Sequence, residues 1–370
     1  MFSALDHAMM ARALRLAERG RYWARPNPHV GCVLADGEQV LGEGFTQPPG
    51  QAHAEVVALE EAGDRARGAT AYVTLEPCAH FGRTPPCADA LITAGVGRVV
   101  AALDDPDPRV SGAGARRLRD AGVDVSVGLL AEQAERQLAG FLLRQRRGRG
   151  RLRAKVAMSL DGRTAMASGE SQWITGAEAR ADVQRLRAES CAVLTGIGTV
   201  LADDCALTVR DGEVSGKPLL PPPAQRALRV VADRCLRTPA GARVRSGKQP
   251  SLLLWGGEGD APPGLGGEQV EVALRDGALD PAAMLEELAH RGCNDVLLES
   301  GPTLAGSFLR AGLVDELIVY IAPRLLGSRA RPMLELPLDN MSEALDLQVL
   351  DRRQIGADLR ITFAPHIPGP

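Results

Sequence analysis

Hydrophobic and polar positions along the first 146 residues repeat with the periods of helices and strands. Residues 4–19 follow a helical period and end at a glycine. Strands are predicted at 30–34 and 39–45, and the Asp36-Gly37 dipeptide between them is typical of a β-hairpin. The elements predicted after the hairpin are a helix at 53–62, a strand at 71–75, a helix at 85–94, a strand at 98–103, a helix at 112–121, a strand at 123–127 and a helix at 131–144. This alternation predicts a mostly parallel sheet covered by helices.

A second α/β pattern follows an Arg- and Gly-rich stretch at 144–153. We interpret this stretch as a domain boundary rather than a nucleic-acid patch, because no aromatic residues are interleaved with the arginines. Strands are predicted at 153–158, 192–195, 228–231, 252–254, 296–299 and 316–321, and helices at 176–187, 281–290 and 302–311. Residues 211–225 contain three consecutive prolines and are expected to form a surface excursion, and strand-like sequence continues to about residue 364. The predicted domains are therefore 1–146 and 147–370.

Composition agrees with two folded domains, because 370 residues allow two at about 100–200 residues each. The 45% hydrophobic and 24% charged residues exclude overall disorder. A net charge of −3 and 3% aromatic residues argue against nucleic-acid and anionic-membrane partners. No apolar run approaches the ~20 residues of a membrane span, and Arg12 and Arg15 interrupt the N-terminal apolar positions. We therefore expect a cytoplasmic protein, and the seven cysteines, an odd count, are expected to be reduced thiols.

The strongest chemical signal combines His53-Ala54-Glu55 with Pro77-Cys78 and Cys87. Two thiolates and one neutral imidazole are typical ligands of catalytic zinc, which keeps a fourth position for water and lowers the pKa of that water to about 7. Glu55, at the start of a helix, is placed to move a proton from water to a leaving amine without binding the metal. This is the signature of zinc-dependent base deaminases. The alternatives are two buried cysteines or a closed zinc site, for which His80 is the nearby fourth ligand.

The spacing of the two cysteines narrows this interpretation. Eight residues separate Cys78 from Cys87, whereas most such deaminases have two. With this spacing, the first half closely resembles the deaminase half of the bifunctional bacterial riboflavin-biosynthesis enzymes, the diaminohydroxyphosphoribosylaminopyrimidine deaminase/reductases. The segments that carry the resemblance are residues 26–31 (PNPHVG), 50–55 (GQAHAE) and 74–87 (TLEPCAHFGRTPPC). The resemblance implies a cytidine-deaminase-like three-layer α/β/α domain that binds one zinc ion per chain.

The same resemblance implies three substrate-binding residues in this half. Asn27 and His80 would line the pyrimidine pocket, and Arg83 would meet the substrate phosphate. A guanidinium beside the metal suits a phosphate, although a lone loop arginine is also often simply solvated. The alternative for Asn27 and His80 is that each caps local backbone.

In the second half, the residues themselves carry a weaker signal. Residues 301–307 (GPTLAGS) follow a predicted strand and open a predicted helix, so their backbone N–H groups are candidates for a phosphate cradle. The alternative is an ordinary strand–helix turn. Gly112-Ala-Gly114 lacks the rest of a dinucleotide-binding fingerprint and is interpreted as a turn.

Five segments of this half resemble the pyrimidine reductase half of the same enzymes: 155–164, 168–174, 196–204, 207–210 and 299–305. The resemblance implies a dihydrofolate-reductase-like α/β domain that binds NADPH without a Rossmann fingerprint. It assigns NADPH contacts to Ala157, Trp173, Thr199, Asp203, Arg234, Gly301, Pro302, Thr303, Leu304, Ala305, Gly306 and Ser307. It assigns contacts with the ribosylaminouracil phosphate to Ser171, Arg187, Leu207, Arg210 and Glu299.

Three ionisable residues, Lys155, Asp203 and Glu299, are candidates for moving the proton that accompanies hydride transfer. Lys155 is one of three lysines in the chain, which favours a function over a solvated strand end. The alternative for Asp203 is a local ion pair, and for Trp173 it is core packing. Cys205 stands where the family usually has proline, a change expected to alter loop rigidity more than chemistry.

Together these motifs predict a two-domain enzyme of riboflavin biosynthesis. The first domain would remove the 2-amino group of 2,5-diamino-6-(5-phosphoribosylamino)pyrimidin-4(3H)-one by hydrolysis, and the second would use NADPH to reduce the ribosyl group of the product to ribityl. The expected partners are small molecules, and the sequence leaves open whether the chain forms a homo-oligomer. One alternative is a nucleobase or tRNA deaminase with an inactive second domain, which predicts a two-residue cysteine spacing and a basic, aromatic face. Another is a regulatory nucleotide-binding module. The set of His53, Glu55, Cys78 and Cys87 argues against it, because a protein that only binds a nucleotide needs no metal ion with an open coordination position beside a carboxylic acid.

Overall fold

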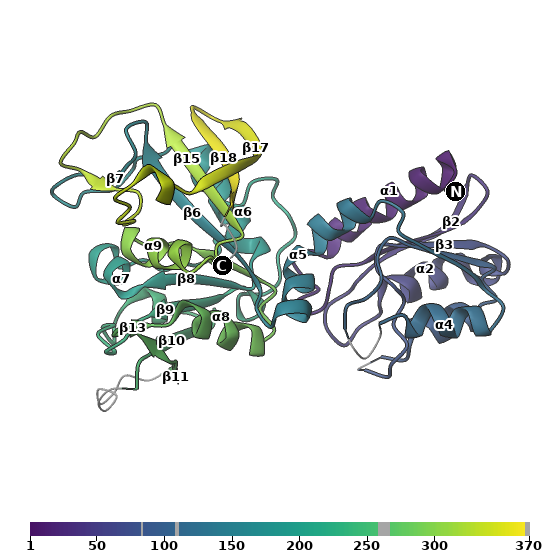
Figure 1. Ribbon diagram of the computed structural model, residues 1–370. Coiled ribbons are helices and arrows are strands. Elements are labelled where there is room, and N and C mark those ends of the chain that lie inside the picture. The colour runs from purple at the N-terminus through teal and green to yellow at the C-terminus, as the bar shows by residue number, and fades with distance from the viewer. Residues whose placement is uncertain (83, 108–110, 258–266, 367–370) are drawn as a thin grey trace. The chain divides into compact units, whose positions relative to one another are not determined.

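The computed structural model describes residues 1–82, 84–107, 111–257 and 267–366. The chain divides into two compact units, Met1–Gly148 and Arg149–Pro370, and Figure 1 labels many of their elements. The stretch at 144–153, interpreted as a domain boundary, consists mostly of regular structure, because the last helix of the first unit continues to Arg147 and the first strand of the second unit begins at Arg151. Gly148 ends that helix in the left-handed conformation, with φ 66°. No helix in the described ranges is both long and apolar enough to cross a membrane.

The first unit is built on a five-stranded sheet with the order β2-β1-β3-β4-β5. Its elements are α1 (Ala4–Gly20), β1 (Gly31–Asp36), β2 (Gln39–Phe45), α2 (Ala54–Ala62), η1 (Gly63–Ala66), β3 (Thr70–Val73), α3 (Cys87–Thr93), β4 (Arg98–Ala101), α4 (Ala113–Asp120), β5 (Asp124–Val127) and α5 (Ala131–Arg147). The predicted helices and strands are all present, with ends that differ by a few residues. The predicted hairpin is present, with β1 antiparallel to β2, and the mostly parallel pairing predicted after it holds for β3, β4 and β5. The sequence did not predict that β1 also pairs antiparallel with β3. The reason is that α2 carries the chain from β2 across β1 to a parallel position at β3.

Glycines in the sheet allow α1 and α2 to pack closely on it. A Cβ added to Gly31 would lie 2.0 Å from the Ala13 carbonyl oxygen of α1, and one on Gly44 would lie 2.0 Å from the Ala54 carbonyl oxygen of α2. Gly44 pairs with Cys32, which follows Gly31 on β1, and successive side chains of a strand face opposite sides of the sheet. Hence α1 and α2 cover opposite faces, and the unit has three layers, α/β/α, as predicted.

The second unit is built on a nine-stranded sheet with the order β11-β10-β9-β8-β14-β6-β15-β18-β17. Its elements are β6 (Arg151–Ser159), β7 (Arg163–Ala165), α6 (Ala177–Glu189), β8 (Ala192–Gly196), α7 (Ile197–Asp203), η2 (Pro223–Gln225), β9 (Leu228–Ala232), η3 (Arg243–Arg245), β10 (Ser251–Trp255), β11 (Glu268–Glu271), β12 (Leu274–Arg275), β13 (Ala278–Leu279), α8 (Pro281–His290), β14 (Asp295–Leu298), α9 (Pro302–Arg310), β15 (Glu316–Ala322), β16 (Arg331–Pro332), η4 (Met341–Glu343), β17 (Asp346–Ile355) and β18 (Asp358–His366). Strands β11 to β15 are parallel in this order, and the hairpin β17–β18 adds antiparallel strands at one edge. The mixed α/β class agrees with the sequence prediction.

The two faces of this sheet bury different helices. Val296 and Leu298 of β14 belong to the core that contains Met284 of α8 and Phe308 of α9. Leu297, between them, packs instead with residues of α6. Since successive side chains of a strand alternate between faces, α8 and α9 cover one face of the sheet and α6 covers the other.

For the hairpin β17–β18, the hydrophobic pattern predicted strand-like sequence to about residue 364 but not the bounds of the two strands. Nearly every residue of β17 is exposed or half-buried, including Leu347, Val349 and Leu350. Without one buried face, the segment lacks the alternation that makes a strand recognisable. Residues 211–225 are mostly exposed, as expected for a surface excursion, although Val214 and Pro221 are buried.

Candidate functional site

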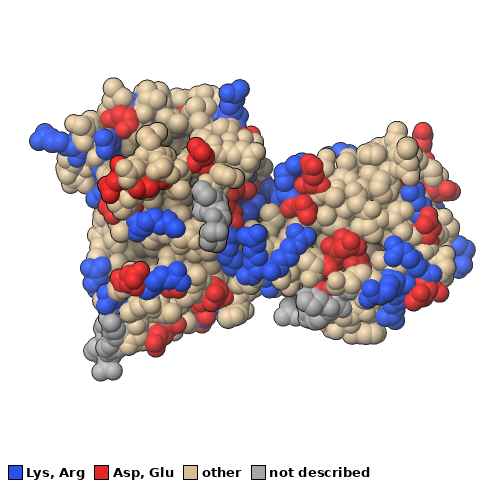
Figure 2. Space-filling model, in the orientation of Figure 1, with Lys and Arg blue, Asp and Glu red and all other residues tan. Residues whose placement is uncertain are grey.

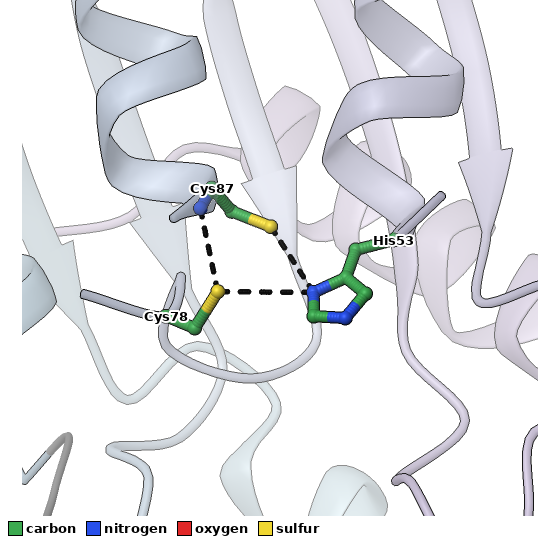
Figure 3. A group of neighbouring side chains, drawn as sticks. All are labelled: His53, Cys78 and Cys87. Carbon is green, nitrogen blue, oxygen red and sulfur yellow. Dashed lines mark hydrogen bonds between the residues drawn. The ribbon is translucent and has the colours of Figure 1, made fainter. Parts of the chain in front are cut away.

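Three side chains with metal-ligating atoms meet in the first unit, as Figure 3 shows. His53 precedes the first residue of α2, Cys78 lies in the loop after β3, and Cys87 is the first residue of α3. His53 Nδ1 lies 3.7 Å from Cys78 Sγ and 3.2 Å from Cys87 Sγ. The ligand atoms of all three residues lie within 4.8 Å of one another. The sequence predicted this group from its residue types and their spacing, and the structure brings its members together.

The geometry of this group fits zinc. Zinc bonds of about 2.0 Å to nitrogen and 2.3 Å to sulfur place the ligand atoms of a tetrahedron roughly 3.5 Å apart, close to the separations observed. Within the described ranges, no further His, Cys, Asp or Glu belongs to the group, so His80 does not close the site as a fourth ligand. Three ligands and an open position are the arrangement of catalytic rather than structural zinc.

The surroundings of the three side chains shift the pKa values of Cys78 and of the neighbouring Glu55 in opposite directions. The hydrogen bond with Cys87 lowers the pKa of Cys78 to about 4, against the effect of burial and with the help of His53. Glu55 lies buried in the first turn of α2, where burial and the Cys78 sulfur raise its pKa to about 7. Glu55 is not a member of the ligand group, which agrees with a carboxylate that acts beside a metal rather than on it.

The other predicted residues of this half are Asn27, His80 and Arg83, the expected substrate contacts. Asn27 is half-buried, and its backbone N–H donates to the Ala24 carbonyl at 2.9 Å. His80 is half-buried, and its Nδ1 is a buried atom with no hydrogen-bond partner in the described structure, so it caps no backbone through that atom. Arg83 lies outside the described residues. No motif pointed to Thr84, whose hydroxyl lies 3.4 Å from His53 Nε2 and can hold the orientation of the imidazole ring.

The second unit contains a cavity of about 1600 Å³. The predicted catalytic, cofactor and substrate residues that line it are Lys155, Ala157, Ser171, Trp173, Arg187, Thr199, Asp203, Leu207, Arg210, Arg234, Glu299, Gly301, Pro302, Thr303, Leu304 and Ser307. Ala305 and Gly306 do not line it, because these positions of α9 face the protein interior. A Cβ added to Gly306 would lie 2.3 Å from the Glu335 carbonyl oxygen, so this glycine serves close packing.

The size and charge of the cavity fit NADPH together with a phosphorylated substrate. Small-molecule sites commonly measure about 300–1,000 Å³, so this cavity has room for a dinucleotide beside a second molecule. Its described lining includes nine arginines and one lysine against four acidic residues. The N-terminal end of α9 also opens into it at Gly301, as expected for a phosphate cradle. The sequence did not single out Arg180, Arg237, Arg243, Arg275, Arg310 and Arg331, because isolated arginines in an Arg-rich chain carry no motif.

A buried ion cluster occupies one part of this cavity. Arg187 holds Glu299 through two hydrogen bonds, of 2.5 Å from Nε and 3.0 Å from Nη2. Lys155 Nζ lies 3.3 Å from the Glu299 carboxylate, so Lys155 is paired rather than a solvated strand end. Burial alone raises the pKa of Glu299, but Arg187 and Lys155 outweigh it and lower the pKa to about 2. The carboxylate is therefore ionised at neutral pH.

Other predicted residues lie at more exposed parts of the cavity. Trp173 is 58% exposed, which makes the core-packing alternative wrong. The centre of its ring lies 4.6 Å from the Arg180 guanidinium carbon, which is a cation–π contact. Both side chains line the cavity, so this contact helps to fix the flat indole ring at the cavity wall. Asp203 ends α7 and accepts a long hydrogen bond of 3.5 Å from Ser171 Oγ. Arg234 donates to the Gly277 carbonyl.

Comparisons with known proteins match both halves of the chain. Residues 151–361 match the family described as the RibD C-terminal domain, and residues 3–103 match the cytidine and deoxycytidylate deaminase zinc-binding region. The chain is 49% identical to riboflavin biosynthesis protein RibD of Escherichia coli (strain K12) over 361 residues, which are 96% of this chain and 98% of the relative. The chain belongs to the RibD family. It is therefore a bifunctional enzyme of riboflavin biosynthesis, with a zinc-dependent deaminase and an NADPH-dependent reductase.

Solved RibD structures have the same fold over the whole chain. Acinetobacter baumannii RibD, form 1, superposes with a TM-score of 0.89 at 44% identity, covering 98% of this chain and 99% of that one. A Thermotoga maritima diaminohydroxyphosphoribosylaminopyrimidine deaminase/5-amino-6-(5-phosphoribosylamino)uracil reductase superposes with a TM-score of 0.86 at 30% identity and the same coverage. The RibD match over both halves disfavours a tRNA or nucleobase deaminase. The face in Figure 2 agrees, because acidic and basic side chains are interspersed on both units.

Proposed function

We propose that the first unit hydrolyses the 2-amino group of 2,5-diamino-6-(5-phosphoribosylamino)pyrimidin-4(3H)-one. The observation that carries this proposal is the meeting of His53, Cys78 and Cys87 beside the buried carboxylate of Glu55, in a chain similar to RibD proteins over nearly its full length. His53, Cys78 and Cys87 hold the zinc ion. Zinc, when bound, supplies Lewis acidity that makes water a nucleophile near neutral pH.

Glu55 is the general base and acid of this step. Its carboxylate takes a proton from the water that attacks C2 and delivers a proton to the amino group, which leaves as ammonia. The residues assigned to the substrate are Asn27 and His80 at the pyrimidine ring and Arg83 at the phosphate. The buried Nδ1 of His80, which has no hydrogen-bond partner among the described residues, supports this role, since a ligand can satisfy such an atom.

The second unit reduces the ribosyl group of the deaminated product at C1′. NADPH, when bound, supplies the hydride. Ala157, Trp173, Thr199, Asp203, Arg234 and the N-terminal residues of α9 are assigned to NADPH, with Gly301, Pro302, Thr303, Leu304 and Ser307 as the members that reach the cavity. Ser171, Arg187, Leu207, Arg210 and Glu299 are assigned to the substrate, and Lys155, Asp203 and Glu299 are the candidates for the proton that accompanies the hydride.

The ion cluster makes Lys155 the strongest of the three proton-donor candidates. A primary ammonium holds three protons and points into the cavity from β6, whereas Glu299 is ionised and fixed by Arg187. Glu299 then orients Lys155 and Arg187 rather than donating a proton itself. The functional domains are taken as 1–146 and 147–370, with boundaries two residues from the division between the compact units.

We also assign the enzyme to the cytoplasm, where cysteines that form no disulfide with one another, as in this structure, stay reduced. A homo-oligomer is supported by β17, which ends the described nine-stranded sheet at one edge and exposes Leu347, Val349 and Leu350 there. Light scattering during gel filtration tests this assembly. A Val349→Lys variant should elute as a smaller species than the wild-type chain if β17 forms the contact.

The central experiment follows ammonia release and NADPH absorbance with the diaminopyrimidine phosphate in three chains: wild type, E55Q and K155M. E55Q should release ammonia at least 100-fold more slowly, yet oxidise NADPH normally when given the deaminated intermediate. K155M should release ammonia normally and fail to oxidise NADPH. Full ammonia release by E55Q would contradict the role of Glu55, and normal NADPH oxidation by K155M would contradict the role of Lys155.

A further inference from the structure

The segment just before Cys78 is held from the N-terminal end of α4. Glu76 is 3% exposed, and its carboxylate accepts three backbone hydrogen bonds. One oxygen accepts from the N–H groups of Asp105 at 3.1 Å and Gly112 at 3.0 Å, and the other accepts from the N–H group of Ala115 at 3.0 Å. A single side chain thus joins the loop after β3 to the loop after β4 and to the first turn of α4.

Gly114 makes a second contact with the same segment. A Cβ at this position would lie 1.9 Å from the Pro77 carbonyl oxygen, so the backbone of α4 packs directly against the residue that precedes Cys78. Gly112, which begins the helix, has a left-handed conformation with φ 76°. The Gly112-Ala-Gly114 pattern, predicted to be a turn, therefore opens a helix and allows its close approach to the Pro77–Cys78 segment.

On its other side, Cys78 is attached to α3. Its carbonyl oxygen accepts from the Ala88 N–H at 3.1 Å, and its Sγ accepts from the Cys87 N–H at 3.3 Å. These bonds join Cys78 to the helix that also carries Cys87. The contacts of Glu76 and Gly114 join the preceding residues to α4. The position of the Cys78 sulfur therefore depends on both α3 and α4.

We propose that Glu76 is a positioning residue for the zinc ligand Cys78. Its buried carboxylate, together with the packing of Gly114 against Pro77, fixes the segment that carries the Cys78 sulfur. The inference rests on the proposed ligand set of His53, Cys78 and Cys87. An ionised carboxylate has two acceptor oxygens, which the three N–H groups occupy. Glutamine has the same shape but places an NH₂ group at one of the two positions, opposite an N–H donor.

The test measures metal binding by the full chain. Zinc affinity is obtained by competition with a chromophoric chelator, and the ligand field by the absorption bands of the Co²⁺-substituted protein. Loss of a residue that orients a metal ligand typically weakens metal binding about 10–100-fold, so E76Q should bind zinc about 10-fold or more weakly and show altered Co²⁺ bands. G114A, which disturbs the segment from the helix side, should change both readouts in the same direction.

Asp6 provides the matched control. It is also a buried carboxylate that accepts a backbone N–H, but its partners are Ser3, Tyr72 and Arg98. D6N should lower the melting temperature of the first unit and leave zinc affinity and the Co²⁺ spectrum unchanged. NADPH oxidation of the deaminated intermediate, measured for every variant, reports that the second unit is folded and active.

The outcomes separate this inference from the proposed function. C78S should lose tight zinc binding, and wild-type affinity in C78S would overturn the ligand set itself. If C78S loses zinc while both E76Q and G114A keep the wild-type affinity and Co²⁺ bands, the positioning role of Glu76 is wrong. An equal loss of zinc affinity in D6N would assign the effect of E76Q to general destabilisation and would also overturn it.

Discussion

The buried pair of Arg187 and Glu299 makes a quantitative prediction about the second unit. Arg187→Met keeps the approximate length of the side chain and removes both hydrogen bonds to the carboxylate, leaving Lys155 as the charged partner. The Glu299 pKa of about 2, against an ordinary value of 4.5, is the joint effect of Arg187 and Lys155 against burial and corresponds to about 3 kcal/mol at about 1.4 kcal/mol per pKa unit. Breaking a buried pair by removing one partner typically costs about 3–5 kcal/mol, and because Lys155 stays beside the carboxylate the lower end of that range is expected. We expect R187M to destabilise the second unit by about 3 kcal/mol at pH 7.

Hydrogen exchange of the full chain measures this loss, because a two-unit protein does not give a single two-state transition. Amide protection of peptides from β6 and β14 should fall about 100-fold in R187M. Arg353→Met is the control, since it breaks an exposed pair with Asp351 and should change protection by less than about fivefold. Protection of R187M within fivefold of the wild-type value would refute the reasoning.

The pH dependence gives a second check on the same pair. Because the folded pKa of Glu299 is lowered, its stabilising contribution is complete above about 4.5 and is lost as the pH falls toward about 2. The difference in protection between R187M and the wild type should therefore be full at pH 7 and shrink below about pH 4.5. The double variant R187M/E299Q should be more stable than R187M at pH 7, since it leaves no carboxylate buried without its main partner.

Three further predictions concern other parts of the chain. Removal of zinc by a chelator should stop ammonia release and leave NADPH oxidation of the deaminated intermediate unchanged; loss of both activities would show that the metal also supports the second unit. Arg229 is fully buried and donates to the carbonyls of Ala206, Arg243, Gln249 and Pro250, so R229K, with fewer donors, should destabilise the second unit by about 3 kcal/mol in the same exchange assay. Gly44→Ala should destabilise the first unit by about 1–3 kcal/mol and weaken zinc binding, because its Cβ would displace α2 at Ala54, next to His53; unchanged zinc affinity would show that α2 moves without the ligand.

Features that depend on local sequence were predictable. Helices and strands with one buried face follow a hydrophobic period, and His53, Cys78 and Cys87 stand in short segments whose residue types indicate zinc chemistry. The fold class followed from the same alternation together with a family resemblance. The antiparallel pairing of β1 with β3 was not predicted, because strand order depends on the crossover through α2, which leaves no hydrophobic pattern on the strand itself.

Features that depend on distant partners were not predictable from one sequence. The acceptors and donors of the Glu76 contacts lie 29 to 39 residues apart, and no spacing rule relates them. Gly306 looked like part of a phosphate cradle because its motif is continuous, but the turn of α9 directs it toward Glu335. The exposure of a side chain also depends on residues distant in sequence. From the sequence, Trp173 was therefore as compatible with a core position as with the exposed position at the cavity that it occupies.

Each unit has its own apolar core, the first drawn from residues between Met9 and Leu142 and the second from residues between Leu152 and Phe363. A substitution that removes one activity therefore leaves the packing of the other unit intact. In a cell that carries two defective copies of the gene, one encoding E55Q and the other K155M, each product keeps the activity that its counterpart lacks. Such a cell is expected to grow without added riboflavin, so mutations in this single gene should fall into two complementing groups that map to the two units.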